Sequence, residues 1–432
     1  MASPQLAIDF PNSALGARWA ESRRLTDALF WHVRPDALYD RPIPERHRLI
    51  FYLGHLEAFD WNLIAGHAFD FAAFHAEFDK LFAFGIDPVD GGLPTDQPAD
   101  WPREDEVRRY CDRVRATLNP LIEKTDSTLL HVAIEHRLMH AETLAYLLHQ
   151  LPLDKKAPLR APPVIEDSGI RQSMVTIPQG TATLGRSHRQ AEFGWDNEFE
   201  EHRVAVPEFH ADVFPVTNAQ FLQFLNAGGY HDSSLWPAED WAWKNSSGLA
   251  HPHFWLRRGN EWRLRAMFAE IPLPLAWPAY LSHAEALAYA RWTGKKLPSE
   301  AQWHRMAYGT PQSDERPYPW GEEAPSPHRG NFDFASWDPT PVKAHPQGNS
   351  AFGVADLLGN GWEWTSTPFQ PFPGFQPFSF YPGYSANFFD GKHFVMKGGS
   401  PRTAACMLRR SFRNWFQPHY SYMYAKFRCV EE

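Results

Sequence analysis

The chain has 432 residues, of which 42 are Lys or Arg and 51 are Asp or Glu, giving a formal net charge of −9. This acidic balance argues against nucleic-acid binding, and a hydrophobic share of 43% excludes a disordered chain. Three cysteines without a CxxC spacing make neither a disulfide framework nor a cysteine metal site. The sequence shows no secretory signal pattern and no apolar run near 18 residues. We therefore expect a cytoplasmic protein of two or three domains without a membrane span.

Tryptophan and glycine divide the chain near residue 164. The first 163 residues hold 4 Trp and 6 Gly, whereas the remaining 269 hold 14 Trp and 21 Gly. We expect an α+β protein with a helical unit over 1–152, a proline-rich linker over 153–172 and a loop-rich unit over 173–432.

The first unit is predicted to be a four-helix bundle. Apolar residues recur near the helical period, and good start and stop residues flank the later patterns: Pro102 precedes one, Asp126 can cap the next, and Pro152 follows it. One long connection, about residues 85–102, joins the second and third helices. The predicted helices cover 13–33, 45–84 with a possible break near Gly66, 103–119 and 126–150.

Histidines in two of these helices make a candidate metal site. His136 and His140 are four residues apart and share one helix face. His55 stands in an apolar run of the second predicted helix. Imidazole ligands suit iron, zinc, copper or nickel. Buried histidines that only form hydrogen bonds are the alternative interpretation, because the chain has 21 histidines.

The second unit is predicted to contain few regular elements and many ordered loops. The segment from Met174 predicts a short strand, a turn and another strand. Short helical segments are expected within 216–230 and 282–309, where Ser or Thr caps precede them and glycines follow.

Three motifs in this unit resemble a known fold. GNGWEWTSTPF (359–369), LPSEAQW (297–303) and the segment 397–430, which begins KGGS, resemble signatures of the formylglycine-generating-enzyme/sulfatase-modifying-factor fold. The resemblance implies a variant of the C-type-lectin architecture. Enzymes of that name use a cysteine pair, and the setting of Cys406 and Cys429 does not suggest one. Because a fold alone does not decide function, a non-catalytic lectin-like binding module is an alternative.

The two halves together resemble the EgtB family of non-heme iron sulfoxide synthases. GHLEAFDW (54–61) and EHRLMHAETL (135–144) resemble its ligand-bearing segments. The resemblance implies that the helices form a DinB-like bundle in which His55, His136 and His140 bind Fe(II). It also implies dioxygen as co-substrate, and hercynine and a sulfur or selenium donor as small-molecule substrates. It predicts one active site with residues from both units.

The same resemblance suggests further site residues. Tyr381 and Tyr384 are candidates for the tyrosine that donates a proton or an electron. Asn414 and Trp415 match the segment that contacts the betaine end of hercynine, and Phe416 is a candidate for the donor side. Packing in the core is the alternative role for Trp415 and Phe416. Met139 stands where the family usually has a substrate-binding Gln.

Two departures from the family pattern concern the donor. LFAFGIDP (81–88) places Phe84 and Gly85 where many members have two tyrosines, and GGLPTDQPADWP (91–102) lacks an arginine-bearing stretch that holds donor carboxylates. The first of these segments and HRLMHAETLAYLLH (136–149) look more like the selenoneine synthases (SenA), a sister group that takes a selenosugar. We expect a selenosugar donor, with cysteine or γ-glutamylcysteine as the alternative. A zinc-dependent hydrolase or thiol transferase built on the same bundle is a third possibility.

Overall fold

The computed structural model describes residues 13–69, 71–83, 93–157, 163, 165, 169–190 and 192–432. Three parts of the chain discussed above lie outside the described residues. They are the positions Phe84 and Gly85, the start of the chain and much of the predicted linker. The chain divides into two compact units, Met1–Leu159 and Arg160–Glu432.

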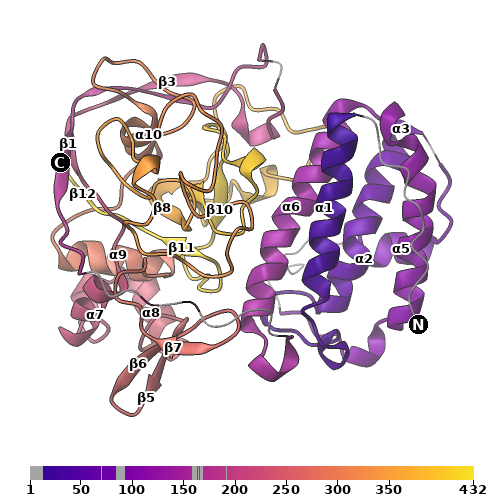
Figure 1. Cartoon of the computed structure of the whole chain (residues 1–432), viewed down its shortest axis with the longest axis horizontal. Coiled ribbons are helices and arrows are strands. Elements are labelled where there is room, and N and C mark those ends of the chain that lie inside the picture. Colours follow the sequence, from indigo (N-terminus) through magenta and orange to yellow (C-terminus); the bar gives the residue numbers. More distant parts are fainter. Residues whose placement is uncertain are drawn as a thin grey trace. The chain divides into compact units, whose positions relative to one another are not determined.

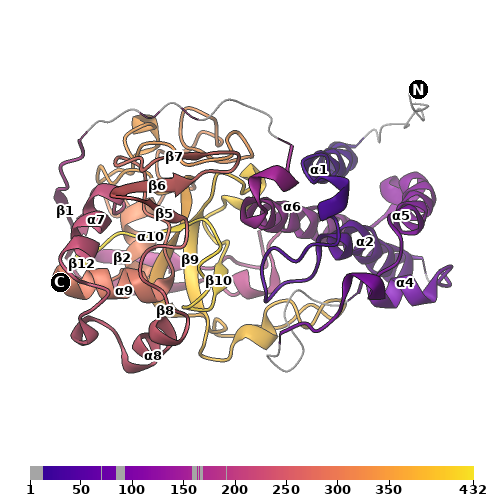
Figure 2. The same ribbon diagram turned by 90° about the horizontal axis from the view of Figure 1, so that it is seen from below.

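The first unit is built from helices. Figure 1 shows the four longest, α1, α2, α5 and α6, running side by side, and Figure 2 shows them from a second direction. Each lies inside one of the four predicted helical ranges, so the helical character of this half is confirmed. That the bundle is DinB-like stays a prediction. The helices are α1 (Ala14–Phe30), α2 (Leu49–Asp60), α3 (Gly66–Ala68), α4 (Ala76–Leu81), α5 (Glu104–Leu118) and α6 (Ser127–Gln150).

The pattern predicted as one long helix over 45–84 is interrupted in the structure. After α2 the chain makes a π-helical turn, Trp61–Ala65, and α3 adds only three residues. A separate helix, α4, follows, and the side chain of His75 caps it by accepting a hydrogen bond from the backbone N–H of Phe78. The long apolar run therefore gives α2, which continues through the π-helical turn into α3, and then the separate helix α4.

Helix α6 is the central element of the first unit. Asp126 caps its start by accepting hydrogen bonds from the backbone N–H groups of Thr128 and Leu129, as the sequence predicted. The helix has 24 residues, and most of its side chains are buried because it packs on both α1 and α2. It therefore offers its polar side chains to the interior of the bundle.

The second unit mixes short helices and small sheets. Its helices are α7 (Asn218–Asn226), α8 (Ala238–Ser246), α9 (His283–Trp292) and α10 (Glu300–Tyr308). Its strands are β1 (Met174–Ile177), β2 (Gly180–Leu184), β3 (His202–Val206), β4 (Phe209–Asp212), β5 (Trp255–Arg258), β6 (Glu261–Arg265), β7 (Glu270–Pro272), β8 (Gly361–Pro368), β9 (Phe394–Gly399), β10 (Asn414–Phe416), β11 (Ala425–Lys426) and β12 (Val430–Glu431). They form sheets in the orders β1-β4-β12, β10-β9-β8-β11, β2-β3 and β5-β6-β7.

The strand–turn–strand pattern predicted from Met174 is confirmed as β1 and β2. The two strands do not pair with each other: β1 pairs antiparallel with β4, and β2 pairs antiparallel with β3. The predicted helical segments contain α7, α9 and α10, whose caps are Thr217, Ser282 and Ser299. Local sequence thus identifies these elements, whereas their partners come from distant parts of the chain.

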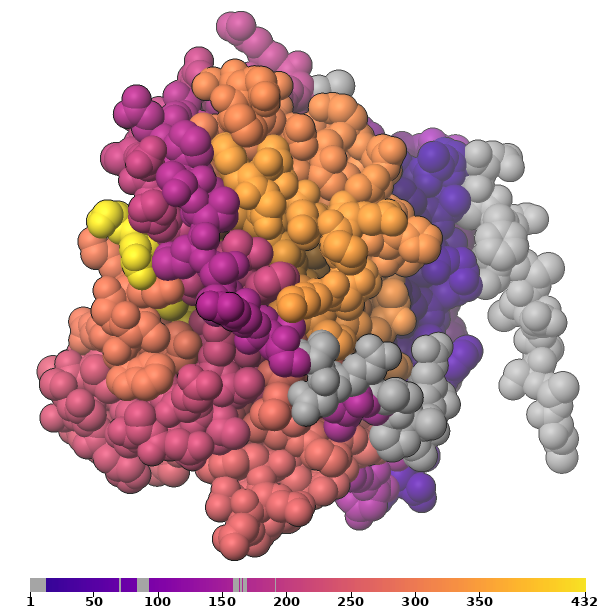
Figure 3. All heavy atoms as spheres, turned by 60° about the vertical axis from the view of Figure 1, so that its left-hand side comes forward, coloured from indigo at the N-terminus to yellow at the C-terminus, as the bar shows by residue number. Residues whose placement is uncertain are grey.

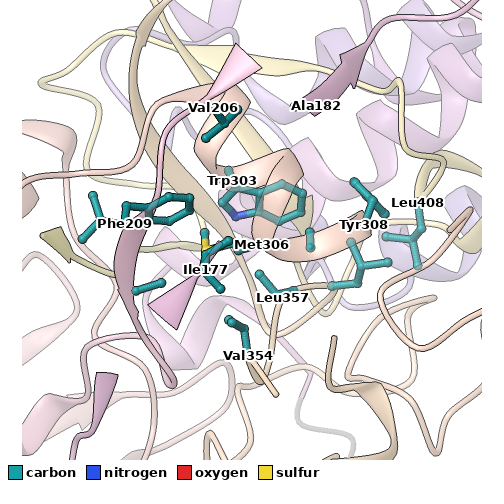
Figure 4. Packing of buried hydrophobic residues seen from close by; sticks show 14 of the residues in the cluster. Ile177, Ala182, Val206, Phe209, Trp303, Met306, Tyr308, Val354, Leu357 and Leu408 are labelled. Carbon is teal, nitrogen blue, oxygen red and sulfur yellow. The ribbon is translucent and has the colours of Figure 1, made fainter. Parts of the chain in front are cut away.

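Helix α10 carries the largest side chain of a hydrophobic core (Figure 4). Trp303, Met306 and Tyr308 of this helix pack with Ile177 and Phe209 of two strands. Figure 3 shows the segment between α10 and β8, in orange, at the surface of the second unit. This core therefore stabilises the second unit, in which many residues belong to no helix or strand.

The sheet β10-β9-β8-β11 supports the predicted binding residues of this unit. β9 pairs antiparallel with β8 and with β10, where Asn414 is opposite Met396 and Trp415 is opposite Val395.

In the part of the chain that the structure describes, no helix is long and apolar enough to cross a membrane.

Candidate metal centre

Helices α2 and α6 bring three histidines together in the first unit. Each of His55, His136 and His140 offers a ring nitrogen, and these atoms lie within 4.8 Å of one another. The Nε2 atoms of His55 and His140 are 3.1 Å apart. All three side chains are buried. The structure therefore collects the three residues that the sequence singled out as possible metal ligands.

Helix geometry explains why His136 and His140 lie together. His136 and His140 are one turn apart on α6, so their rings point from the same face, and their centroids are 4.5 Å apart. His55 comes from the middle of α2, which packs on α6. Its ring lies 4.7 Å from that of His140 and 5.3 Å from that of His136. Two helices thus suffice to build the cluster.

A backbone carbonyl fixes the orientation of His55. Its Nδ1 lies 2.6 Å from the carbonyl oxygen of Phe82, so Nδ1 must carry the hydrogen and donate it. In the neutral ring the lone pair is then on Nε2, the atom that faces His140. Histidines that bind metals are usually oriented by such a hydrogen bond on the other ring nitrogen.

Gly54 permits this contact. A Cβ atom at position 54 would lie 2.6 Å from three carbon atoms of the Phe82 ring. Only a residue without a side chain lets that ring lie against α2 directly beside His55. Sequence reasoning missed the role of Phe82, since the carbonyl of a residue 27 positions away has no signature in the sequence.

Burial keeps the cluster uncharged. It lowers the pKa of His55 to about 4. It also lowers the pKa values of His136 and His140 well below the ordinary histidine value, and neighbouring histidines add to this shift. The three imidazoles are therefore neutral near pH 7, which is the form that binds a metal ion. Three neutral imidazoles fit a divalent transition metal and leave further coordination positions open.

Aromatic side chains line the cluster. Phe59 stacks on His136 with ring centroids 3.4 Å apart, and Phe51 stacks on His55 at 4.8 Å. The Tyr52 ring lies 5.9 Å from His140. These walls exclude water and strengthen electrostatic interactions inside the site. Met139, a sequence-predicted substrate contact, is half-buried on α6 in the position before His140.

An ionic network lies beside the histidines and was also missed from the sequence. Arg23, Arg115 and Arg137 bind Glu57 at 3.0, 2.7 and 3.0 Å, and Arg137 also binds Asp60 at 2.5 Å. The acidic residues occupy α2 at i and i+3, inside the apolar run that contains His55. Two acidic residues three positions apart in an apolar helix were the signal that could have revealed this network. Buried charges need partners of opposite charge.

Trp415 of the second unit lies in an aromatic cluster. Its ring stacks on Phe369 at 4.2 Å and 7°, and Tyr384 meets its edge at 5.5 Å. Tyr384 is buried and stacks on Trp195 at 3.9 Å. Tyr381 lies 5.6 Å from Tyr384, and burial raises its pKa to about 12. The structure therefore groups three of the residues predicted from the sequence.

Asn414 and Phe416 flank Trp415 on β10. Successive side chains of a strand point to opposite faces, so these two lie on the face opposite Trp415. The Asn414 Oδ1 accepts a hydrogen bond from the backbone N–H of Trp415 at 2.9 Å. The Phe416 ring stacks on Tyr420 at 5.1 Å. Both side chains are half-buried.

Comparisons with known proteins agree with the division into two units. Residues 164–432 match the family described as sulfatase-modifying factor enzyme 1-like domain. The formylglycine-generating enzyme of Mycobacterium tuberculosis is 28% identical over an alignment that covers 46% of this chain and 75% of that protein.

Two further relatives match more of the chain. The hercynine oxygenase of Mycolicibacterium smegmatis is 36% identical over 341 residues, which cover 76% of this chain and 76% of that protein. Ergothioneine biosynthesis protein 1 of Neurospora crassa is 28% identical over an alignment that covers 92% of this chain and 55% of that protein. These two alignments cover a larger share of the chain than its second unit, so the likeness extends into the helical unit.

Proposed function

The chain belongs to the EgtB-like family of enzymes with a sulfatase-modifying factor enzyme 1-like domain, and from this premise we propose that it joins hercynine to a selenium donor. It is an oxidoreductase-type enzyme. In the proposed reaction the carbon between the two imidazole nitrogens of hercynine exchanges its C–H bond for a C–Se bond to the selenol of a selenosugar. Dioxygen is the oxidant: one oxygen atom leaves as water with the C–H and Se–H hydrogens, and the other is transferred to selenium. The three-histidine cluster is the observation that carries this proposal.

His55, His136 and His140 would hold Fe(II). Their imidazoles are neutral, and the cluster has no protein ligand beyond three in the described part of the chain, which would leave coordination positions on the ion open. Bound Fe(II) supplies the redox chemistry with dioxygen that forming this bond requires. The chain itself orients His55 through the Phe82 carbonyl and excludes water with Phe51 and Phe59.

Hercynine recognition is proposed for the second unit. A trimethylammonium group is attracted to aromatic faces, and the cluster of Trp415, Tyr384 and Tyr381 offers three rings. The resemblance makes the side-chain amide of Asn414 the candidate partner of the carboxylate; because this side chain lies on the face of β10 opposite Trp415, that role stays a prediction. Tyr381 is protonated at neutral pH, as tyrosines ordinarily are, and its raised pKa makes it a weaker acid, so its role as a donor of a proton or an electron stays a prediction. That both units supply residues to one site stays a prediction, as do the roles of Met139 and Phe416.

The proposal of a selenosugar as donor depends on the segment 91–102, which lacks arginines. Within its described part, Asp96 binds the nearby Arg41 and Arg48; the Arg48 Nε lies 2.8 Å from the Asp96 carboxylate. The Trp101 Nε1–H also donates to this carboxylate. These arginines already have a carboxylate partner, which disfavours a second role as a clamp for an amino-acid donor. A sulfur donor is the second candidate, because the relatives are named for hercynine oxygenation and ergothioneine biosynthesis.

One assay tests the reaction and the donor. The full chain, loaded anaerobically with Fe(II), is given hercynine and dioxygen with selenoglucose, cysteine or γ-glutamylcysteine in separate reactions. Mass spectrometry identifies the product, and an electrode measures oxygen consumption. We expect a selenium-containing hercynine derivative with selenoglucose. Turnover with cysteine but none with selenoglucose would overturn the selenium assignment. A loaded protein that turns over no donor would overturn the proposed function.

A further inference from the structure

We propose that Arg137 is a positioning residue that sets the distance between His55 on α2 and the two histidines on α6. This inference rests on the proposed metal site. Arg137 directly follows His136 in the chain, and Leu56 directly follows His55. The Arg137 Nη2 donates to the Leu56 carbonyl oxygen at 3.0 Å. One guanidinium therefore connects the residues that follow proposed ligands on two different helices.

Two carboxylates of α2 hold this guanidinium in place. The Arg137 Nη2 lies 2.5 Å from Asp60 Oδ2 and 3.0 Å from Glu57 Oε1. Its Nη1 donates to the Thr26 hydroxyl of α1 at 3.3 Å. The Arg137 side chain is only 2% exposed, so water hardly competes for these bonds. Its contacts span three helices, and two of those helices carry the histidines.

This connection bears directly on metal binding. Metal–nitrogen distances in proteins vary by only about 0.2 Å, whereas a helix that slides by one residue moves by about 1.5 Å. Contacts that orient ligands without touching the metal typically change metal affinity by about 10-fold to 100-fold when they are removed. An anchor on the α2 backbone beside His55 is therefore placed to maintain the spacing of the cluster.

A lysine could not make the same connection. The planar guanidinium presents several N–H groups at once, whereas an ammonium group is a compact charge on a flexible chain. R137K keeps the charge that Glu57 and Asp60 require and loses the simultaneous contacts with the Leu56 carbonyl and the Thr26 hydroxyl. This variant separates the positioning role from simple charge neutralisation.

Arg115 provides a matched control in the same network. It lies on α5 and binds Glu57 at 2.7 Å, and its two Nη atoms bind the two oxygens of Asp27 at 2.7 Å each. Its contacts with α2 are made to the Glu57 side chain. R115K disturbs the same buried carboxylate without removing an anchor from the backbone next to His55.

The experiment titrates the metal-free full chain with Co²⁺ under anaerobic conditions and follows the visible absorption of the bound ion. We expect R137K to bind Co²⁺ about 10-fold to 100-fold more weakly than the unchanged protein, with a shifted spectrum. R115K should bind within about threefold of the unchanged protein. Urea unfolding of both variants measures stability separately. Equal Co²⁺ affinity of R137K and the unchanged protein would overturn the proposal, as would equal weakening by R115K.

A second variant covers the case in which R137K does not fold. D60N keeps the size of the side chain and removes the charge that holds Nη2, so weaker Co²⁺ binding is expected there as well. Unchanged affinity in D60N would then overturn the proposal. If the unchanged protein binds no Co²⁺, the metal site itself fails rather than the role of Arg137.

Discussion

The two units hold their candidate site residues by different means. In the first, two regular helices present three histidines, and packing between helices sets the distances. In the second, short strands and loops hold an aromatic cluster, and buried ion pairs such as Glu363–Arg428 stabilise that irregular backbone. Helical periodicity therefore predicts that His136 and His140 meet, whereas their contact with His55 and the contacts in the second unit depend on long-range packing.

The largest expected effect tests the helical half. We expect H136A to lose nearly all bound iron and all oxygen consumption, because two imidazoles seldom hold the ion alone. The matched control is H131A, which removes another histidine of α6 that lies outside the cluster. Metal analysis of anaerobically purified proteins makes the comparison. Full iron content in H136A would contradict the proposed site.

The next effect tests the loop-built half. The fully buried Glu363 accepts hydrogen bonds from Arg428 at 2.8 and 2.6 Å and from the Trp303 indole at 2.9 Å. E363Q leaves a buried arginine without its counter-charge, so unfolding free energy should fall by about 3–5 kcal/mol. Urea denaturation followed by tryptophan fluorescence measures the loss. T176A, an exposed change on β1, is the control and should cost less than about 0.5 kcal/mol.

A smaller effect is expected at Gly54. In G54A the new methyl group would lie 2.6 Å from the Phe82 ring, so the ring and its carbonyl must move. We expect a loss of about 1–3 kcal/mol from overpacking and Co²⁺ binding weakened by about 10-fold. G66A is the control, because a Cβ atom there meets nothing within 4 Å. Equal Co²⁺ affinity of G54A and the unchanged protein would show that the Phe82 carbonyl does not orient His55.

The last expected effect is a dependence of stability on pH that both units share. Burial lowers the pKa of His55 and of His283 to about 4, whereas these side chains titrate near 6.5 in the unfolded chain. Between these values the unfolded chain binds more protons, so stability falls as pH decreases from 6.5 towards 4. Each group contributes up to about 1.4 kcal/mol per pH unit. Unfolding of metal-free protein at several pH values measures the slope, and H283Q should reduce it. An unchanged slope in H283Q would contradict this assignment.

Much of the fold was accessible from the sequence where the signal is local. Cap residues such as Asp126, Ser282 and Ser299 mark the starts of real helices. The four-residue spacing of His136 and His140 predicted their proximity correctly. The pairing of β1 with β4 was inaccessible, since nothing local selects a partner more than 30 residues away. The contact of His55 with Phe82 was missed because it is made by a backbone carbonyl, and the contact of Arg137 with Leu56 was missed because the two residues belong to different helices.

The contact between His55 and Phe82 links the cluster to a helix too short to persist alone. Helix α4 has six residues, and Phe82 directly follows its last turn. Isolated helices of this length are not stable in water, so α4 depends on its tertiary contacts, including this hydrogen bond. A ligand bound to the Nε2 atom of His55 would then suppress local unfolding of α4 by mass action. The rate of amide hydrogen exchange in α4 would thereby report how much of the cluster is occupied.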